Sequence, residues 1–156
     1  MDELKADYLV IGSGMAGLWF SLKASQHGSV VIVTKKEDAD SNTNYAQGGI
    51  AAAVAEDDSP VLHYEDTIRA GAGLAHPDIV QLVTESGPGL VRELSGIGIG
   101  FSTYTDSHGH SHFDLGQEGG HHRRRIIHAR DLTGSEIESG LLKAIHSQPR
   151  ITVLEQ

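Results

Sequence analysis

Two short apolar runs, residues 7–11 and 30–33, stand out near the start of the chain. Runs of this length with few polar residues are typical of buried parallel strands, because both faces of such a sheet are covered. The stretch 15–27 between them has the length of a helix and is followed by Gly28, a residue that commonly ends one. The pattern therefore predicts a strand, a helix and a second strand.

The later part of the chain alternates helical signals with small and polar segments. Asp58-Ser59-Pro60 combines a capping residue with a proline at the first helical position, which predicts a helix to about Arg69. The other expected elements are a helix over 77–85 that Gly87-Pro88 interrupts and 90–95 continues, a loop or weak hairpin over 101–118, a short strand over 125–129, a helix from Thr133 that ends before Pro149, and a third parallel strand over 150–154.

A glycine-rich turn joins the first strand to the first helix. Glycines at this turn allow a tight bend, a close approach of the backbone to a pyrophosphate, and close packing of helix on strand. The N-terminus of the helix adds unpaired N–H groups and a positive dipole end. The turn therefore predicts a dinucleotide site at Gly12, Ser13, Gly14, Met15, Ala16 and Gly17.

The end of the second strand departs from the usual dinucleotide pattern. An acidic residue is expected there to accept hydrogen bonds from ribose hydroxyls, but the chain has Lys35, which accepts none. Either another group binds the ribose or the cofactor binds less tightly. A basic residue also leaves open a 2′-phosphate and NADP.

These elements define an α/β protein with a Rossmann-like sheet, parallel and with helices on both faces. We expect a dinucleotide βαβ unit at about 6–35, a cofactor-wrapping loop at 41–55, a helical and loop insert at 58–130, and a helix and third strand at 133–154. Three strands make an unfinished doubly wound sheet. The chain is therefore predicted to be the N-terminal part of a larger protein.

Composition excludes several classes of function. The net charge of −9 argues against a nucleic-acid partner, and with no cysteine the chain forms no disulfide. The charged N-terminus does not resemble a signal peptide, and no apolar run is long enough for a membrane span. A cytoplasmic location is expected.

Histidines cluster in the second half of the chain. His108, His110 and His112 alternate in a loop rich in Gly, Ser and Asp, so a metal is conceivable, since imidazole is a common ligand. The segment has no evident fixed geometry and no cysteine, and no metal site is predicted.

Several motifs in one order resemble a known family. They include residues 11–17, 45–52, 65–67, 70–73, 118–121 and 124–129. The chain resembles the flavoprotein superfamily of succinate dehydrogenase and fumarate reductase, and most closely its L-aspartate oxidase branch. That branch also carries lysine in place of the acidic ribose ligand, so the resemblance implies FAD in place of NADP.

The resemblance also implies roles for individual residues. Contacts to FAD are expected at the glycine turn, at Lys35, and at Asn42, Thr43, Asn44, Tyr45, Ala46, Gln47, Gly48 and Gly49. Respiratory members place a histidine at the position of Asn42 and bond it to the flavin, so FAD here should be noncovalent. Glu118 and His121 are expected to orient the substrate, with Glu118 receiving its amino group. The family's catalytic residues lie further downstream, so none is assigned here.

The activity implied is conversion of L-aspartate to iminoaspartate, with oxygen or fumarate as final electron acceptor, as the first step of NAD biosynthesis. Coupling to quinolinate synthase is a possible partnership. By itself the chain should be inactive and bind FAD weakly. Two alternatives stay open: a succinate dehydrogenase or fumarate reductase flavoprotein, and a noncatalytic module that binds FAD or ADP.

Overall fold

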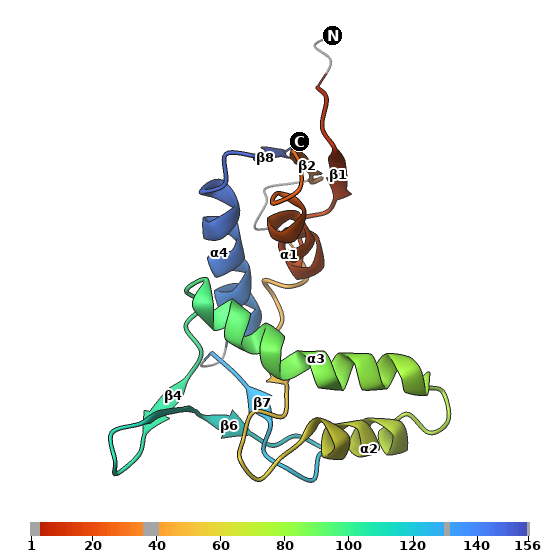
Figure 1. Cartoon of the computed structure of the whole chain (residues 1–156), viewed down its shortest axis with the longest axis vertical. Coiled ribbons are helices and arrows are strands. Elements are labelled where there is room, and N and C mark those ends of the chain that lie inside the picture. Colours follow the sequence, from red (N-terminus) through yellow and green to blue (C-terminus); the bar gives the residue numbers. More distant parts are fainter. Residues whose placement is uncertain (1–3, 36–40, 130–131, 156) are drawn as a thin grey trace. The chain divides into compact units, whose positions relative to one another are not determined.

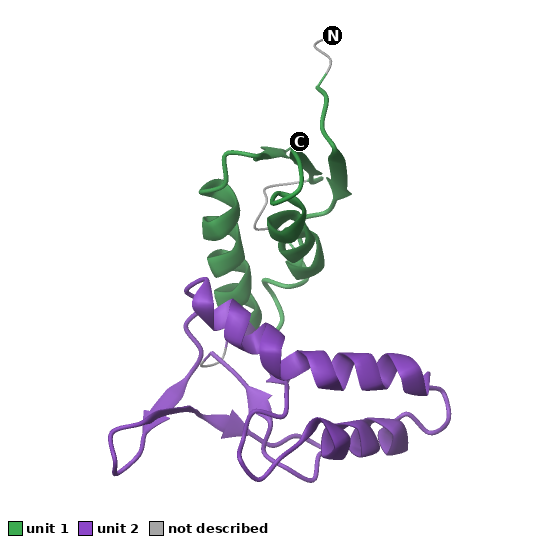
Figure 2. Ribbon diagram, viewed as in Figure 1, with its two compact units in different colours: residues 1–47, 134–156 green, residues 48–133 purple. Residues whose placement is uncertain are grey.

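The computed structural model describes residues 4–35, 41–129 and 132–155. The chain divides into two compact units, which Figure 2 shows in different colours. Unit 1 comprises residues 1–47 and 134–156, and unit 2 comprises residues 48–133. The loop 41–55, which was expected to wrap the cofactor, is shared between the two units.

A three-stranded parallel sheet forms the centre of unit 1. It contains β1 (Tyr8–Ile11), β2 (Val30–Val33) and β8 (Ile151–Leu154) in the order β1-β2-β8. Tyr8 pairs with Val30, which pairs in turn with Ile151, so the three strands start level. All three predicted strands are confirmed. The order third-second-first is one half of a Rossmann sheet, which confirms the predicted class.

Two helices accompany this sheet, α1 (Met15–Ala24) and α4 (Thr133–His146). Right-handed crossovers from β1 to β2 and from β2 to β8 place both helices on the same face. Leu18, Leu141 and Ile145 are buried there. On the other face Leu9 and Ile11 are 65% and 85% exposed, so the described residues cover one face of this incomplete sheet, whereas helices were expected on both.

Helix α1 ends earlier than its sequence pattern indicated. It stops at Ala24, three residues before His27. The reason is a change in hydrogen bonding: the N–H groups of Gln26 and His27 donate to carbonyls three residues back, at 3.3 and 2.8 Å. Such bonds tighten the last turn and terminate the regular helix.

Unit 2 contains a pair of packed helices, α2 (Pro60–Ala70) and α3 (Pro77–Gly96), which lie side by side in Figure 1. The predicted start of α2 is confirmed, since Ser59 Oγ accepts a hydrogen bond from the N–H of Leu62 at 3.2 Å.

Among the described residues, no helix combines the length and apolar character required to span a bilayer.

The predicted interruption of the second helix in this unit is wrong. Helix α3 runs unbroken through Gly87 and Pro88, although its axis changes direction partway along in Figure 1. Proline removes one backbone hydrogen bond and bends a helix, but burial of an apolar face can outweigh that cost. Val91 and Leu94, which follow the proline, are 1% and 7% exposed.

Two small antiparallel sheets complete unit 2. One contains β3 (Ile50–Ala51), β7 (Ile126–Ile127) and β6 (Leu115–Gly116) in the order β3-β7-β6. The other is a hairpin of β4 (Thr103–Thr105) and β5 (Ser111–Phe113), so the hairpin alternative for 101–118 is confirmed. The short strand expected over 125–129 is confirmed as β7, whereas β3 and β6 were not expected.

A buried ion-pair cluster connects the elements of unit 2. The guanidinium of Arg125, fully buried, donates to both carboxylate oxygens of Asp58 at 2.8 and 2.9 Å. It also donates to Asp66 Oδ2 at 2.9 Å. Asp58 precedes the cap of α2, Asp66 lies within α2, and Arg125 precedes β7, so a single buried cation connects α2 with β7.

Asp66 has further partners besides Arg125. Burial by itself raises the pKa of Asp66, but the N–H and the ring of His122, with the positive charge of Arg125, outweigh burial and lower that pKa from 3.8 to about 2. Arg69 also forms an ion pair with the carboxylate. Because the pKa is lower in the folded chain, the charged carboxylate stabilises the fold, and this contribution is lost as the pH falls towards 2.

Replacing Asp66 with asparagine should therefore destabilise the chain in a pH-dependent way. At neutral pH we expect a loss of about 3 kcal/mol, since Arg125 would lose a buried partner. The difference from the unsubstituted chain should shrink as the pH falls from about 4 towards 2, because the native carboxylate then becomes protonated too. Urea unfolding across this range measures it.

Asp57→Asn is the matched control, because the Asp57 side chain is 79% exposed and its Oδ2 lies 3.9 Å from Arg123 Nε. Exposed pairs contribute little to stability, so this variant should unfold like the unsubstituted chain at every pH. A difference for Asp66→Asn that does not change with pH would contradict the assignment of the lowered pKa to this carboxylate.

Candidate cofactor-binding site

The turn between β1 and α1 has the geometry expected of a dinucleotide turn. Gly12 has a φ of +103°, a conformation that other residues rarely adopt, and its N–H donates to the carbonyl of Val33 at 2.8 Å. The hydroxyl of Ser13, a buried residue, donates to Thr34 Oγ1 at 3.2 Å. The turn is thereby held to the end of β2.

The third glycine of the motif allows the helix to lie close to the strand. A Cβ built on Gly17 would collide with the carbonyl oxygen of Gly12 and approach a methyl group of Val10 to 3.3 Å. A side chain at this position would push α1 away from β1. The packing role predicted for Gly17 is therefore supported by the structure.

The N-terminus of α1 is suited to an anion. Its N-cap is Gly14, which provides no side-chain cap, and no acidic residue occupies the first turn. The N–H of Met15 donates to Thr43 Oγ1 at 3.1 Å. A helix N-terminus with these features presents N–H groups and a positive dipole end, which fits the pyrophosphate of a dinucleotide.

Residues 41–47 lie against this turn and against α4 in unit 1. Ser41 Oγ accepts the N–H of Thr43 at 3.0 Å and donates to the buried carboxylate of Glu138. The carbonyl of Ala46 accepts the N–H of Gly134 at 3.0 Å. A Cβ on Gly134 would collide with the carbonyl of Thr43, so this approach requires glycine.

The structure brings together part of the predicted cofactor set. Thr43 contacts the glycine turn, whereas Asn42, Tyr45, Ala46 and Gln47 are exposed in the same loop and Asn44 is half-buried. Lys35 is exposed just after β2. Gly48 and Gly49 belong to unit 2, where a Cβ on Gly49 would lie 2.5 Å from the carbonyl of Ile127.

The two residues expected to orient the substrate also lie in unit 2. Glu118 is exposed, and its carbonyl accepts the N–H of His121 at 3.3 Å. The ring of His121 lies 3.3 Å from a guanidinium nitrogen of Arg125 and 5.7 Å from the ring of His63. His121 is thus held by the buried ion-pair cluster, and Glu118 is three residues away.

His63 is buried in contact with this cluster. Burial, together with the charges of Arg125 and His121, lowers the pKa of His63 despite the opposing carboxylates of Asp58 and Asp66. The neutral ring adds no further positive charge beside Arg125.

Sequence reasoning missed the residues that support these segments. The charged side chains of Asp58, Arg125 and Glu138 are buried, yet none was assigned a role in supporting the site. One signal was present: Arg125 comes directly before the apolar pair Ile126-Ile127, where a charge is unusual unless it is paired. Nothing local indicated Gly134, because its neighbours Thr43 and Ala46 lie far away in sequence.

Comparison with known proteins defines the class. Residues 7–156 match the FAD binding domain family, and the chain belongs to that family. This match confirms FAD as the predicted cofactor and agrees with the glycine turn and the uncapped N-terminus of α1.

Particular relatives narrow the class further. The chain is 46% identical over 149 residues to L-aspartate oxidase 2-a, chloroplastic, of Nicotiana tabacum. The matched region covers 96% of this chain and 22% of that protein. It is 42% identical over 155 residues to L-aspartate oxidase of Vibrio cholerae, and that match covers 99% of this chain and 29% of the relative. The chain therefore spans under a third of the curated relatives it matches, and the resemblance to L-aspartate oxidases is confirmed.

A solved structure shows the same fold. A mutated E. coli quinol fumarate reductase superposes with a TM-score of 0.91 at 26% identity, covering 99% of this chain and 26% of that one. The fold is therefore that of the flavoprotein part of such enzymes.

Gly134→Ala tests the contact between α4 and residues 41–47. The added Cβ should cost about 1 to 3 kcal/mol in the free energy of unfolding, because it collides with the carbonyl of Thr43. Gly89→Ala in α3 is the control, since nothing lies within 4 Å of that position. Urea unfolding should show the control unchanged or more stable, and equal stability for both variants would refute the contact.

Proposed function

We propose that this chain supplies an FAD-binding part of an L-aspartate oxidase, which converts L-aspartate to iminoaspartate with oxygen or fumarate as the final electron acceptor. The observation that carries the proposal is the identity of 46% and 42% to two L-aspartate oxidases over nearly the whole chain. The glycine turn and the uncapped α1 support it physically, since they suit the pyrophosphate of FAD.

The chain's own residues have distinct tasks in this proposal. The N–H groups at the start of α1 bind the pyrophosphate, and Gly14 leaves room for it. Asn42 has no imidazole to bond to a flavin, so FAD binds noncovalently. Lys35 cannot accept a bond from a ribose hydroxyl, and the ADP half is therefore held chiefly by the turn.

Substrate recognition is assigned to the segment from Glu118 to His121. A carboxylate can pair with the ammonium of aspartate, which succinate lacks, and such charge-assisted bonds are among the stronger ones. His121 is held by Arg125 and lies against His63, so the segment is anchored at one end. FAD supplies the electron acceptor when bound, and these residues orient the substrate.

Gly14→Val should abolish binding of FAD. The side chain would occupy the space where the pyrophosphate approaches the turn. A Cβ at that position lies 3.5 Å from Thr43 Oγ1, an ordinary contact. Calorimetric titration of the chain with FAD, ADP and NADP measures the effect. We expect weak binding of FAD and ADP to the unsubstituted chain and none to the variant.

The control for this experiment is Gly96→Val at the end of α3, where nothing lies within 4 Å. It should bind FAD like the unsubstituted chain. Tighter binding of NADP than FAD, or unchanged binding in Gly14→Val, would overturn the assignment of the turn. Yellow colour that stays with acid-precipitated protein would contradict a noncovalent cofactor.

Glu118→Gln should impair oxidation of aspartate in a longer protein that contains this chain. Loss of a charged partner for the ammonium is expected to lower kcat/KM for L-aspartate by roughly 10- to 100-fold. Hydrogen peroxide release measures the rate, and Glu85→Gln on α3 is the control. The unsubstituted longer protein should leave succinate untouched, and the 156-residue chain alone should show no turnover.

The main alternative is a fumarate reductase or succinate dehydrogenase flavoprotein, which the superposition with quinol fumarate reductase favours. Comparable rates with succinate and aspartate in the longer protein would support that alternative. A noncatalytic FAD-binding or ADP-binding module would show binding and no turnover in the longer protein. A cytoplasmic location and coupling to quinolinate synthase stay predictions.

A further inference from the structure

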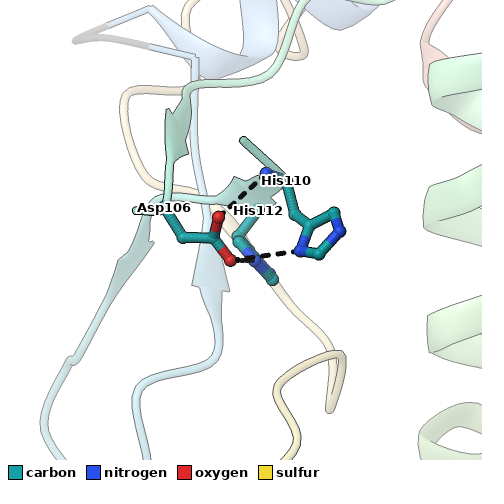
Figure 3. Close-up of side chains that lie close together, drawn as sticks. All are labelled: Asp106, His110 and His112. Atoms are coloured by element: carbon teal, nitrogen blue, oxygen red, sulfur yellow. Dashed lines mark hydrogen bonds and ion pairs between the residues drawn. The ribbon is translucent and has the colours of Figure 1, made fainter. Parts of the chain in front are cut away.

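The hairpin β4–β5 brings three metal-ligating side chains together. His112 lies on β5, His110 comes directly before that strand, and Asp106 faces them from the other side of the turn (Figure 3). One donor atom from each residue lies within 4.8 Å of the other two. The alternation of histidines had no predicted geometry in sequence. In the structure the N–H of Asp106 donates to the carbonyl of His110 at 2.9 Å, and both rings contact the carboxylate of Asp106.

The distances suit a small cation. Asp106 Oδ2 lies 3.1 Å from His112 Nε2 and 3.4 Å from His110 Nδ1. A tetrahedral zinc ion with bonds of about 2.0 to 2.1 Å keeps its ligand atoms about 3.3 Å apart. The two distances from Asp106 Oδ2 to the histidine nitrogens are therefore already close to this value. His110, whose side chain is 74% exposed, is free to turn and complete the third.

The carboxylate and one ring are held in position by further contacts within the hairpin. Asp106 Oδ1 accepts the N–H groups of His108 and His110, both at 2.8 Å, which leaves Oδ2 directed at the rings. The ring of His112 stacks on Tyr104, with centroids 5.5 Å apart and planes at 27°. Partners of this kind orient metal ligands and tune their affinity.

The cluster has access to solvent on one side. Asp106, His112 and Tyr104 line a cavity of about 760 Å³ in unit 2, whose wall also includes Glu56. Water in this space could complete the coordination of a cation that three protein ligands leave open. The acidic wall would favour the approach of a cation.

We propose that Asp106, His110 and His112 form a binding site for one divalent transition-metal cation of the Zn²⁺ type. Two imidazoles and a carboxylate without thiolate suit Zn²⁺, Co²⁺ or Ni²⁺, whereas Mg²⁺ and Ca²⁺ prefer oxygen ligands. The cation would clip the two strands of the hairpin together. The site is separate from the residues assigned to FAD and to the substrate, so it does not depend on the proposed function.

Calorimetric titration of the 156-residue chain with Zn²⁺ tests the proposal. We expect one site with affinity in the micromolar range, no comparable binding of Mg²⁺, and visible absorption bands of tetrahedral Co²⁺ when Co²⁺ is added instead. His110→Ala, His112→Ala and Asp106→Asn should each weaken Zn²⁺ binding by at least about tenfold, since losing even a partner of a ligand commonly costs that much.

The matched control is His108→Ala, which removes a histidine from the same turn without removing a ligand. Its backbone N–H still donates to Asp106, and it should bind Zn²⁺ like the unsubstituted chain. Asparagine at position 106 keeps an oxygen for these backbone bonds, so its loss of affinity reports on the ligand. Circular dichroism should be unchanged in all four variants.

Three results would overturn the proposal. One is the absence of a site tighter than the millimolar range. Another is binding that survives both His110→Ala and His112→Ala, which would place the ion at other histidines. The last is an equal loss of Zn²⁺ affinity in His108→Ala, which would indicate nonspecific binding to a histidine-rich segment. The contacts of Asp106 would then be hydrogen bonds of the hairpin only.

Discussion

The organisation of unit 2 depends on the buried guanidinium of Arg125 and its two carboxylate partners. A charge in the interior is costly unless it is paired and hydrogen-bonded, and Arg125 meets that condition with three bonds of 2.8 to 2.9 Å to Asp58 and Asp66. Each partner comes from a different segment. Because an unpaired Arg125 would be far less stable in the interior, α2 and the strand β7 must adopt their observed arrangement together.

Unit 1 is organised by a different requirement, the need to leave space. Gly17 allows α1 to approach β1, and Gly134 allows α4 to approach residues 41–47. Both act through the absence of a side chain, although the N–H of Gly134 also donates to the carbonyl of Ala46. The result is a helix N-terminus whose N-cap, Gly14, has no side chain. Thr43 Oγ1 accepts the N–H of Met15, and a phosphate can accept other N–H groups of the first turn. The unit therefore presents backbone N–H groups where other helices would have a capping side chain.

Most of the regular elements could be predicted from local sequence signals. Apolar runs gave β1, β2 and β8, and the cap at Ser59 gave the start of α2. The strands β3 and β6 could not be found, because each has two residues and exists through pairing with β7, which does not follow either strand directly. The local breaking signal at Gly87-Pro88 was misleading because burial of the flanking helix decides the outcome.

The candidate site divides in the same way between local and distant causes. The glycine turn is a local motif, so the tight bend at Gly12 and the close helix packing at Gly17 could be predicted. The support of His121 could not, because Arg125 is in turn held by Asp58 and Asp66, 67 and 59 residues away. This support has a consequence for Glu118, which is exposed and not itself part of the cluster. His121 contacts the fully buried guanidinium of Arg125. The position of the segment that carries Glu118 in unit 2 therefore depends on the bonds that Arg125 makes with its carboxylate partners.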